Sequence, residues 1–166
     1  MSPLELWPIG AIRRNHALEH ATINVLSESS ANLRLVGRSD WAGFTLYGPV
    51  GSDEVEAAVA GALDRLRAGE SELAVHPSCG TNFATGYVLT ALASYAALRG
   101  KRRSGLEKVL QLVLGVGAAL LLAQPVGVKI QEYVTTSVGV GLLRVKDIRR
   151  LQLGKVIIHR IDTAQE

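Results

Sequence analysis

Two long uncharged segments near the middle of the chain dominate its pattern of hydrophobic and polar positions. Residues 83–98 contain no charged side chain, and uncharged residues extend this segment back to residue 80. Residues 109–128 are also uncharged. Because about 20 apolar residues in a helix cross the hydrocarbon layer of a bilayer, and because a short charged loop joins the segments, the pattern predicts a two-helix transmembrane hairpin. The alternative is a pair of buried helices in a soluble protein.

Small residues recur at a spacing of four in each segment, with Ala93 and Ala97 in the first and Gly115 and Ala119 in the second. Such small side chains let two helices approach closely in lipid. Pro125 predicts either the end of the second helix or a kink in it, because proline lacks the main-chain N–H that a helix uses. We therefore expect a closely packed hairpin.

The polar arm before the hairpin shows both helical and strand periodicity. Apolar residues three and four positions apart predict a helix over residues 8–27 and a second helix that ends near Gly69. We expect Ser52 or Asp53 to cap this second helix, with Asp53 and Glu56 at capping-box spacing. Alternating segments predict strands at residues 32–38, 43–47 and 72–75.

The arm after the hairpin predicts an amphipathic stretch at the membrane surface, residues 128–134, and then two antiparallel strands, residues 142–146 and 155–162. Both arms leave the hairpin on the same side, so these strands are expected to join the sheet of the first arm. The sequence therefore predicts an α+β fold, a small mixed sheet-and-helix domain built from both chain ends on a two-helix transmembrane hairpin. The expected segments are an N-terminal α+β arm at 1–80, the hairpin at 81–128 and a C-terminal β arm at 129–166.

Composition favours a membrane protein over a nucleic-acid-binding one. Hydrophobic residues make up 48% of the 166 residues, and the mean hydropathy is +0.20. The formal charge is +3, but the basic residues form no long tract and aromatic residues make up only 5%. Proteins that bind nucleic acids combine a basic surface with side chains that stack on bases. The expected partner is therefore a lipid bilayer, with no nucleic acid.

The orientation of the hairpin stays open because two arguments oppose each other. The loop at residues 99–108 carries five basic residues and one acidic residue, which places it in the cytoplasm by the positive-inside rule. Both arms would then lie outside, yet the first residues lack the basic and apolar regions of a signal peptide that would carry them across. The small residues of the hairpin would also suit a homo-oligomer.

The first chemical motif is H-x-x-E-H, formed by His16, Glu19 and His20. Residues four positions apart on a helix lie about 40° apart around its axis, so both imidazoles can reach one metal ion. Glu19 can face the same site and act as a general base on a metal-bound water, which is the inverted arrangement of zinc proteases. The alternative is a helix with two histidines near its surface.

The second motif is H-P-S-C-G-T-N, in which His76 and Cys79 stand three residues apart. Its proline and glycine favour a turn, and Thr81 or Asn82 is expected to cap the helix that follows. Cys79 is the one cysteine, so no disulfide forms within the chain. The alternatives are a buried hydrophobic role for Cys79 and a carbonyl-bonded histidine at a strand end for His76.

Together the two motifs contain three of the four histidines and the one cysteine. A tetrahedral zinc site takes three or four such ligands from separate elements. His16 and His20 with either Cys79 or His76 would leave the fourth position to water, as in catalytic sites, whereas all four would close the site. The remaining histidine, His159, lies in a predicted strand and is expected to be structural.

The sequences H-x-x-E-H-x-T-I-N at residues 16–24 and H-P-x-C-G-T-x-F at residues 76–83, with the apolar hairpin that follows, resemble the YqhQ-like uncharacterised bacterial membrane proteins. The resemblance implies that the two motifs belong to one site, in a multi-pass protein of the bacterial cell membrane, and it implies no substrate. Ala21 and Ser78 stand where that family has basic residues. The resemblance therefore carries over no anion-binding role for these two positions.

Three functions are compatible with these residues. The first is a membrane-anchored, zinc-dependent, peptidase-like hydrolase with its site at the membrane surface and a peptide or a lipid as substrate. The second is a non-enzymatic membrane protein in which a closed metal site serves assembly or partner binding. The third is a polar cluster without a metal that binds a lipid headgroup or a small polar ligand. The coordination of the metal would separate the first two functions. The hydrolase would have three protein ligands and a water, whereas the closed site would have four protein ligands.

Overall fold

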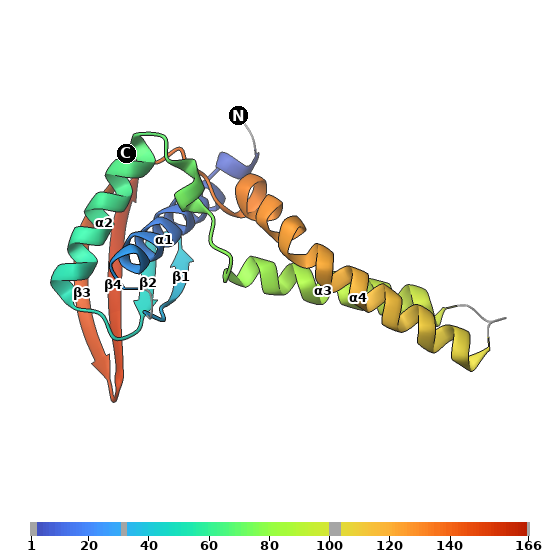
Figure 1. Ribbon diagram of the computed structural model, residues 1–166. Coiled ribbons are helices and arrows are strands. Elements are labelled where there is room, and N and C mark those ends of the chain that lie inside the picture. The colour runs from blue at the N-terminus through green and yellow to red at the C-terminus, as the bar shows by residue number, and fades with distance from the viewer. Residues whose placement is uncertain (1–2, 31–32, 100–103, 166) are drawn as a thin grey trace. The chain divides into compact units, whose positions relative to one another are not determined.

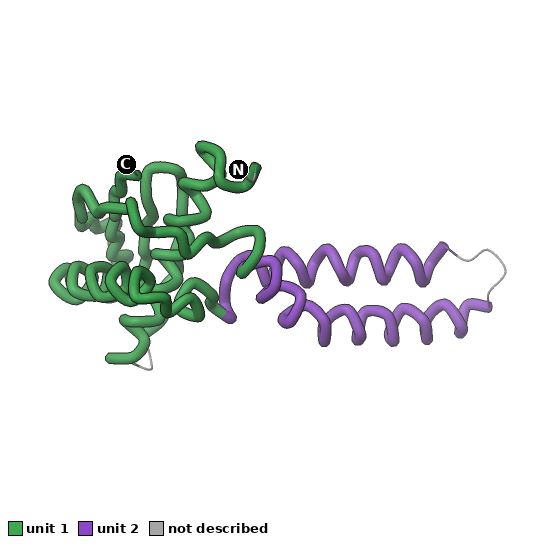
Figure 2. The backbone as a smooth tube through the Cα atoms, turned by 90° about the horizontal axis from the view of Figure 1, so that it is seen from above, with its two compact units in different colours: residues 1–76, 132–166 green, residues 77–131 purple. Residues whose placement is uncertain are grey.

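The computed structural model describes residues 3–30, 33–99 and 104–165 of the chain. The fold divides into two units (Figure 2): Met1–His76 with Glu132–Glu166, and Pro77–Gln131. The first unit is a mixed α+β structure to which both ends of the chain contribute, and the second is a helical hairpin (Figure 1).

A four-stranded sheet runs through the first unit in the described part of the chain. Strands β1 (Val36–Asp40) and β2 (Gly43–Tyr47) form one hairpin, and β3 (Leu143–Leu153) and β4 (Val156–Gln165) form another. The strand order is β1-β2-β4-β3, and each neighbouring pair is antiparallel. The pairing of β2 with β4 joins strands from the two arms, as the sequence predicted.

Two helices accompany the sheet, α1 (Ile9–Ser29) and α2 (Ser52–Arg67). Both were predicted, but the cap of α2 differs from the prediction. The main-chain N–H of Gly51 donates a hydrogen bond to Oε2 of Glu54 at 2.9 Å. The pair at capping-box spacing is therefore Gly51 with Glu54, and not Asp53 with Glu56, because Ser52 and Asp53 already belong to the first turn.

A 3-10 turn stands where the sequence predicted a strand at residues 72–75. The main-chain N–H of Leu73 donates to the carbonyl oxygen of Glu70 at 3.3 Å, which is a bond within the turn rather than across a sheet. A short apolar segment can bury its side chains in either conformation, so alternation alone did not separate them. Three short helical turns are described, η1 (Pro3–Glu5), η2 (Ser71–Ala74) and η3 (Gln131–Thr135).

Alternate residues of the sheet form one core with α1 and α2, and Phe44 of β2 and Ile161 of β4 are fully buried in it. A buried polar bridge ties α1 to the same sheet. The side-chain amide of Asn15 donates to the carbonyl oxygen of Asp40 at 2.8 Å, and its oxygen accepts from the hydroxyl of Thr163 at 2.8 Å. This bridge holds α1 against β1 and β4 at the residue that precedes the H-x-x-E-H motif.

The second unit consists of α3 (Gly80–Leu98) and α4 (Gly105–Ile130), which pack against each other. A Cβ atom added at Gly115 would lie 3.5 Å from the Cβ of Ala93, so the two backbones approach closely at this point. At Gly127 an added Cβ would overlap Asn82. The small residues singled out in the sequence are at or near this contact, namely Ala93, Ala97, Gly115 and Ala119.

The cap predicted for the first helix of the second unit was wrong. Helix α3 is capped by Cys79, whose Sγ accepts from the main-chain N–H of Thr81 at 3.4 Å, and not by Thr81 or Asn82. The reason is that the helix begins at Gly80, so Thr81 and Asn82 already belong to its first turn. Of the two alternatives for Pro125, the end of the helix is excluded, because Pro125 lies inside α4. A kink at Pro125 stays a prediction.

Among the described residues, one helical segment has the length and hydropathy to cross a membrane. It is Gly105–Thr135, 31 residues long, with a mean hydropathy of 2.0 in its most apolar window. Helix α3 has 19 residues, but its hydroxyl and amide side chains lower its hydropathy. The helical hairpin is therefore present, whereas two transmembrane helices are not shown. Residues 100–103 of the predicted basic loop lie outside the described residues.

Candidate metal centre

Three histidines of the first unit come together beside α1. His16 and His20 occupy successive turns of the helix, their ring centroids lie 4.3 Å apart, and one ring nitrogen of each lies within 4.8 Å of the other. The ring of His76, which follows η2, lies 6.0 Å from that of His20. Burial lowers the pKa of the His76 imidazole, which favours the neutral form of this ring.

Main-chain carbonyl groups hold the two imidazoles of α1. Nδ1 of His16 lies 3.0 Å from the carbonyl oxygen of Thr135, and Nδ1 of His20 lies 2.8 Å from that of Ala74. A carbonyl oxygen only accepts, so each Nδ1 must donate. In its neutral form, each ring consequently carries its proton on Nδ1 and its lone pair on Nε2. This is the arrangement found in many metal sites, where one ring nitrogen is anchored and the other binds the ion.

Asn24 supports the cluster from one turn further along α1, and the sequence analysis missed it. Its side-chain amide donates to the carbonyl oxygens of Leu73 at 2.9 Å and of Val75 at 3.3 Å. These bonds tie η2 and the residue before His76 to the helix. The signal was present in the sequence, because Asn24 continues the spacing of four that links His16 and His20 and so lies along the same side of the helix.

Glu19 is buried between α1 and β1. Its carboxylate accepts a hydrogen bond from the hydroxyl of Ser39, and any side chain at Gly37 would overlap it. Burial raises the pKa of Glu19, while the bond from Ser39 and the charge of His16 act in the opposite direction. The carboxyl group is thus held by β1 and interacts electrostatically with His16.

Cys79 belongs to the second unit, where it caps α3, while the three histidines belong to the first. Since it follows His76 by three residues, the chain keeps their Cα atoms within roughly 11 Å of each other. The first unit therefore brings together His16, His20 and His76, with Glu19 on the neighbouring side of α1. His159 lies apart from them in β4, where its Nε2 is 3.4 Å from the hydroxyl of Ser52.

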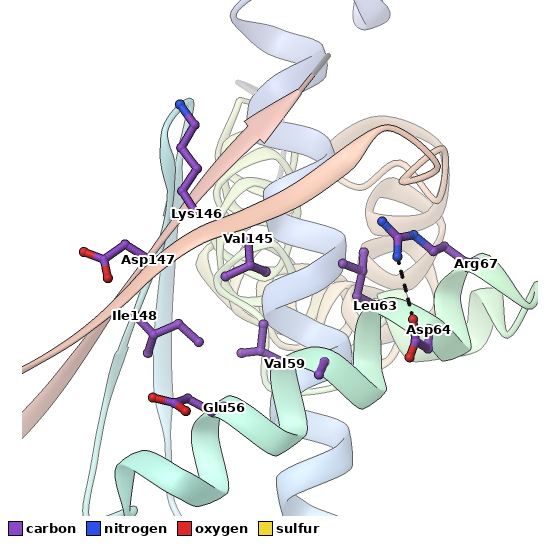
Figure 3. A pocket seen from close by; sticks show the side chains of 10 residues that line it. Glu56, Val59, Leu63, Asp64, Arg67, Val145, Lys146, Asp147 and Ile148 are labelled. Atoms are coloured by element: carbon purple, nitrogen blue, oxygen red, sulfur yellow. Dashed lines mark ion pairs between the residues drawn. The ribbon is translucent and has the colours of Figure 1, made fainter.

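A groove of about 540 Å³ lies between α2 and β3 in the first unit (Figure 3). Val59 and Leu63 of the helix face Val145 and Ile148 of the strand, and charged side chains surround them. None of the described residues that line this groove is a histidine or a cysteine. The groove therefore contains none of the imidazole and thiol groups that the two sequence motifs supply, and the histidine cluster remains the candidate metal centre.

The fold and the cluster define the class of protein as an α+β unit with a polar histidine site, joined to a helical hairpin. Comparison with known families matches residues 11–148 to "Domain of unknown function (DUF6391)", and the chain belongs to this family. It is 34% identical over 140 residues to an uncharacterized protein of the cyanobacterium Picosynechococcus sp., a match that covers 79% of this chain and 68% of the relative. No solved structure matches the chain.

Proposed function

We propose that the protein is a membrane-anchored, zinc-dependent hydrolase, peptidase-like in its chemistry, with its site at the membrane surface. The observation that carries the proposal is the pair of imidazoles on α1, each anchored through Nδ1 to a main-chain carbonyl oxygen. Two anchored histidines four residues apart on one helix are well suited to bind a single zinc ion through Nε2.

The ligand set would take its remaining members from the second motif. His76 is the third imidazole of the cluster, next to His20. Cys79, three residues further on, would add a thiolate. Imidazole and thiolate are the groups that zinc binds most readily in proteins. With three of these four ligands in place, water would complete the coordination.

Glu19 is the general base in this proposal. A zinc ion held by such ligands supplies an acidified water molecule. The carboxylate of Glu19 would accept the proton from that water and pass it to the leaving group, which is an amine if the substrate is a peptide and an alcohol if it is a lipid ester. The hydroxyl of Ser39 would hold the carboxylate in position during the transfer.

Helix α4 would anchor the protein in the bacterial cell membrane, with α3 crossing beside it as a two-helix hairpin. The support is the apolar surface of both helices, which a soluble hairpin of this size would not expose. The YqhQ-like resemblance of the two motifs points to the same location. Large apolar side chains exposed on the two helices include Phe83, Val88, Leu92, Leu98, Leu106, Val109, Leu110, Val113, Leu114, Leu120, Leu121 and Leu122.

A closed structural metal site is the second candidate, and the burial of its ligands favours it. His20 is 2% exposed and Cys79 is 7% exposed, which leaves little room for a substrate at these two groups. If His16, His20, His76 and Cys79 all bind, the metal would stabilise the protein for assembly or partner binding. X-ray absorption at the zinc edge would separate four nitrogen and sulfur ligands from three with an added oxygen.

The first experiment is elemental analysis of the full-length protein purified in detergent, beside a His16→Ala/His20→Ala variant and a His159→Leu control. We expect about one zinc per chain in the wild type and the control, and a loss of the metal in the double variant. Circular dichroism of each sample would establish that it is folded. If the wild type holds no metal after zinc is supplied, both metal proposals fail, and a cluster that binds a headgroup or small polar ligand replaces them.

The catalytic role of Glu19 is tested by Glu19→Gln, which keeps the side-chain shape and removes the base. We expect this variant to retain zinc while hydrolysis of a fluorogenic peptide mixture falls about 10²–10⁴-fold. Ser39→Ala is the companion variant, and it should lower the rate less because the carboxylate itself remains. Full turnover by a zinc-loaded Glu19→Gln protein would remove Glu19 from the mechanism.

A further inference from the structure

The outer face of the sheet carries an apolar row that crosses all four strands. The strand register places Val36 opposite Tyr47, Tyr47 opposite Ile158, and Ile158 opposite Leu151. Residues that are directly opposite in antiparallel strands point to the same face. The core residue Phe44 lies three positions from Tyr47 in β2, and its partner Ile161 lies three positions from Ile158 in β4. Because successive residues of a strand alternate between faces, Phe44 and Ile161 point to the other face. The row therefore lies on the side turned away from α1 and α2.

This row is exposed, and the end of the β3–β4 hairpin extends it. Val36 is 67% exposed and Leu151 is 57% exposed. Leu153 and Val156 are opposite each other at the end of the hairpin, on the same face, and are 75% and 47% exposed. These six residues (Val36, Tyr47, Leu151, Leu153, Val156 and Ile158) form what is called here the outer apolar patch.

Charged residues of the same face are arranged so that positive charge remains beside the outer apolar patch. The acidic side chains of the outer face are engaged by arginines: Arg160 binds Asp40 at 2.6 Å and Asp162 at 2.8 Å, and Arg149 binds Asp147 at 3.3 Å. Two arginines thus face three aspartates, which leaves one net negative charge within this group. The patch itself adjoins other cations.

Three basic residues next to the patch have no ion-pair partner within the part of the chain that the structure describes, Arg34, Arg38 and Lys155. Arg34 and Arg38 flank Val36 two residues away on either side, and both are exposed. Lys155 precedes Val156 in the turn of the β3–β4 hairpin. Exposed aliphatic side chains thus alternate with unneutralised cations along one end of the sheet.

We propose that the outer apolar patch is a docking surface for an anionic phospholipid bilayer. Leucine and valine side chains would enter the boundary between headgroups and acyl chains, and Arg34, Arg38 and Lys155 would bind the phosphate groups. The charge pattern favours this occupant over a second copy of the chain, because the three cations beside the patch outnumber the single carboxylate charge that the arginines of the same face leave unbalanced. The inference is independent of the metal site, since none of its residues takes part.

The test uses the full chain in lipid nanodiscs and a single tryptophan at the patch. The variant carries three substitutions, Trp7→Phe, Trp41→Phe and Leu153→Trp, so that the tryptophan at position 153 is the sole indole. Brominated phosphatidylcholine quenches the fluorescence of indoles that enter the bilayer. A matched control carries Ala60→Trp instead, at an exposed position on α2. We expect blue-shifted emission and about twofold stronger quenching at position 153 when phosphatidylglycerol is included, with little change at position 60.

A second variant separates anionic lipid from other occupants. Arg34→Glu, Arg38→Glu and Lys155→Glu in the Leu153→Trp protein should abolish the extra quenching while the circular dichroism spectrum stays unchanged. Quenching that is absent in both lipids would overturn the proposal. A blue shift without quenching would assign the patch to a protein partner, and equal quenching with and without phosphatidylglycerol would refute the anionic requirement.

Discussion

At the scale of single residues, the histidine cluster depends on acceptors that come from distant parts of the chain. The carbonyl oxygen that binds His20 is 54 residues away in sequence, and the one that binds His16 is 119 residues away. Each bond fixes a tautomer and a ring orientation, which the identity of the histidine alone does not. Asn24 contributes indirectly. It bonds the main chain on both sides of Ala74, the residue whose carbonyl oxygen accepts from His20.

Replacing Asn24 with leucine, which has a similar size, should weaken zinc binding while every proposed ligand is retained. The two bonds to η2 would be lost, so the Ala74 carbonyl group and His76 would no longer be held in place. We expect the zinc affinity to fall about 10–100-fold in a competition titration. Ser27→Ala is the control on the same helix, since its hydroxyl bonds the carbonyl group of Ile23 within α1. An unchanged affinity in Asn24→Leu would contradict this supporting role.

His159 should make the folded protein sensitive to acid. It is fully buried, its Nδ1 has no hydrogen-bond partner among the described residues, and burial together with the charge of Arg150 lowers its pKa below the ordinary value of 6.5. The unfolded chain therefore binds a proton at higher pH than the folded protein does. Stability is complete above pH 6.5 and falls as the pH decreases from 6.5 toward the lower pKa of the folded state.

Chemical unfolding at several pH values would measure this loss, with His159→Leu as the comparison. The variant removes the titrating group and a buried nitrogen without a partner, so its free energy of unfolding should decline less between neutral and mildly acidic pH. The difference between the two proteins isolates His159 from the other histidines. Parallel pH profiles would show that His159 does not contribute.

At the scale of elements, α1 presents three different sides to its surroundings. Leu18 enters the core, Asn15 and Glu19 contact the sheet, and His16 and His20 line the candidate metal centre. A period of 3.6 residues allows this division, because residues four apart stay on one side while adjacent residues do not. The helix therefore connects the core, the sheet and the histidine cluster.

Helices α3 and α4 contact each other through small residues, which let their backbones approach closely. Gly127→Ala should destabilise the hairpin, because the added methyl group would overlap Asn82, whose Cα would lie 2.9 Å away. We expect a loss of about 1–3 kcal/mol in the free energy of unfolding in detergent. Gly117→Ala in the same helix is the matched control, because nothing lies within 4 Å of its added Cβ. Equal stability of the two variants would contradict the close approach at Gly127.

At the scale of the whole molecule, the first unit is assembled from both ends of the chain and the second from the segment between them. The two chain ends meet in the pairing of β2 with β4, so the sheet is complete only after the hairpin has been made. The apolar exposure is concentrated on α3, α4 and the outer apolar patch. This distribution gives the proposed membrane location a direct test.

The full-length protein should remain in the membrane fraction after an alkaline carbonate wash. Leu114→Lys with Leu121→Lys would place two charges on α4 at side chains that are 64% and 81% exposed. A charge near the centre of a membrane helix costs about 2.5–3.5 kcal/mol, so we expect the double variant to be largely released. Ala60→Lys on α2 is the control and should stay in the pellet. Release of the wild type by the wash would mean that α4 does not cross the membrane.

The sequence by itself determined the helices and strands that depend on interactions between residues close together along the chain. Periodicity was sufficient to place α1, α2, the helical hairpin and the four strands, although β1 begins later than predicted and β3 is longer. The small residues of α3 and α4 marked their contact. It also identified His16, Glu19 and His20 as candidates through their helical spacing, and His76 and Cys79 through the second motif. The sequence pattern mispredicted η2, because a strand and a 3-10 turn satisfy the same pattern equally. It also mispredicted the caps of α2 and α3, because a cap depends on the residue at which the helix begins.

Only the tertiary structure decided which distant groups meet. The acceptors for His16 and His20, the hydroxyl of Ser39 beside Glu19, and the pairing that aligns Val36 with Leu151 across four strands all join residues far apart in sequence. No period along the chain encodes such contacts. They arise when burial of the apolar faces brings the segments together, and the polar groups that are buried with them must then find partners.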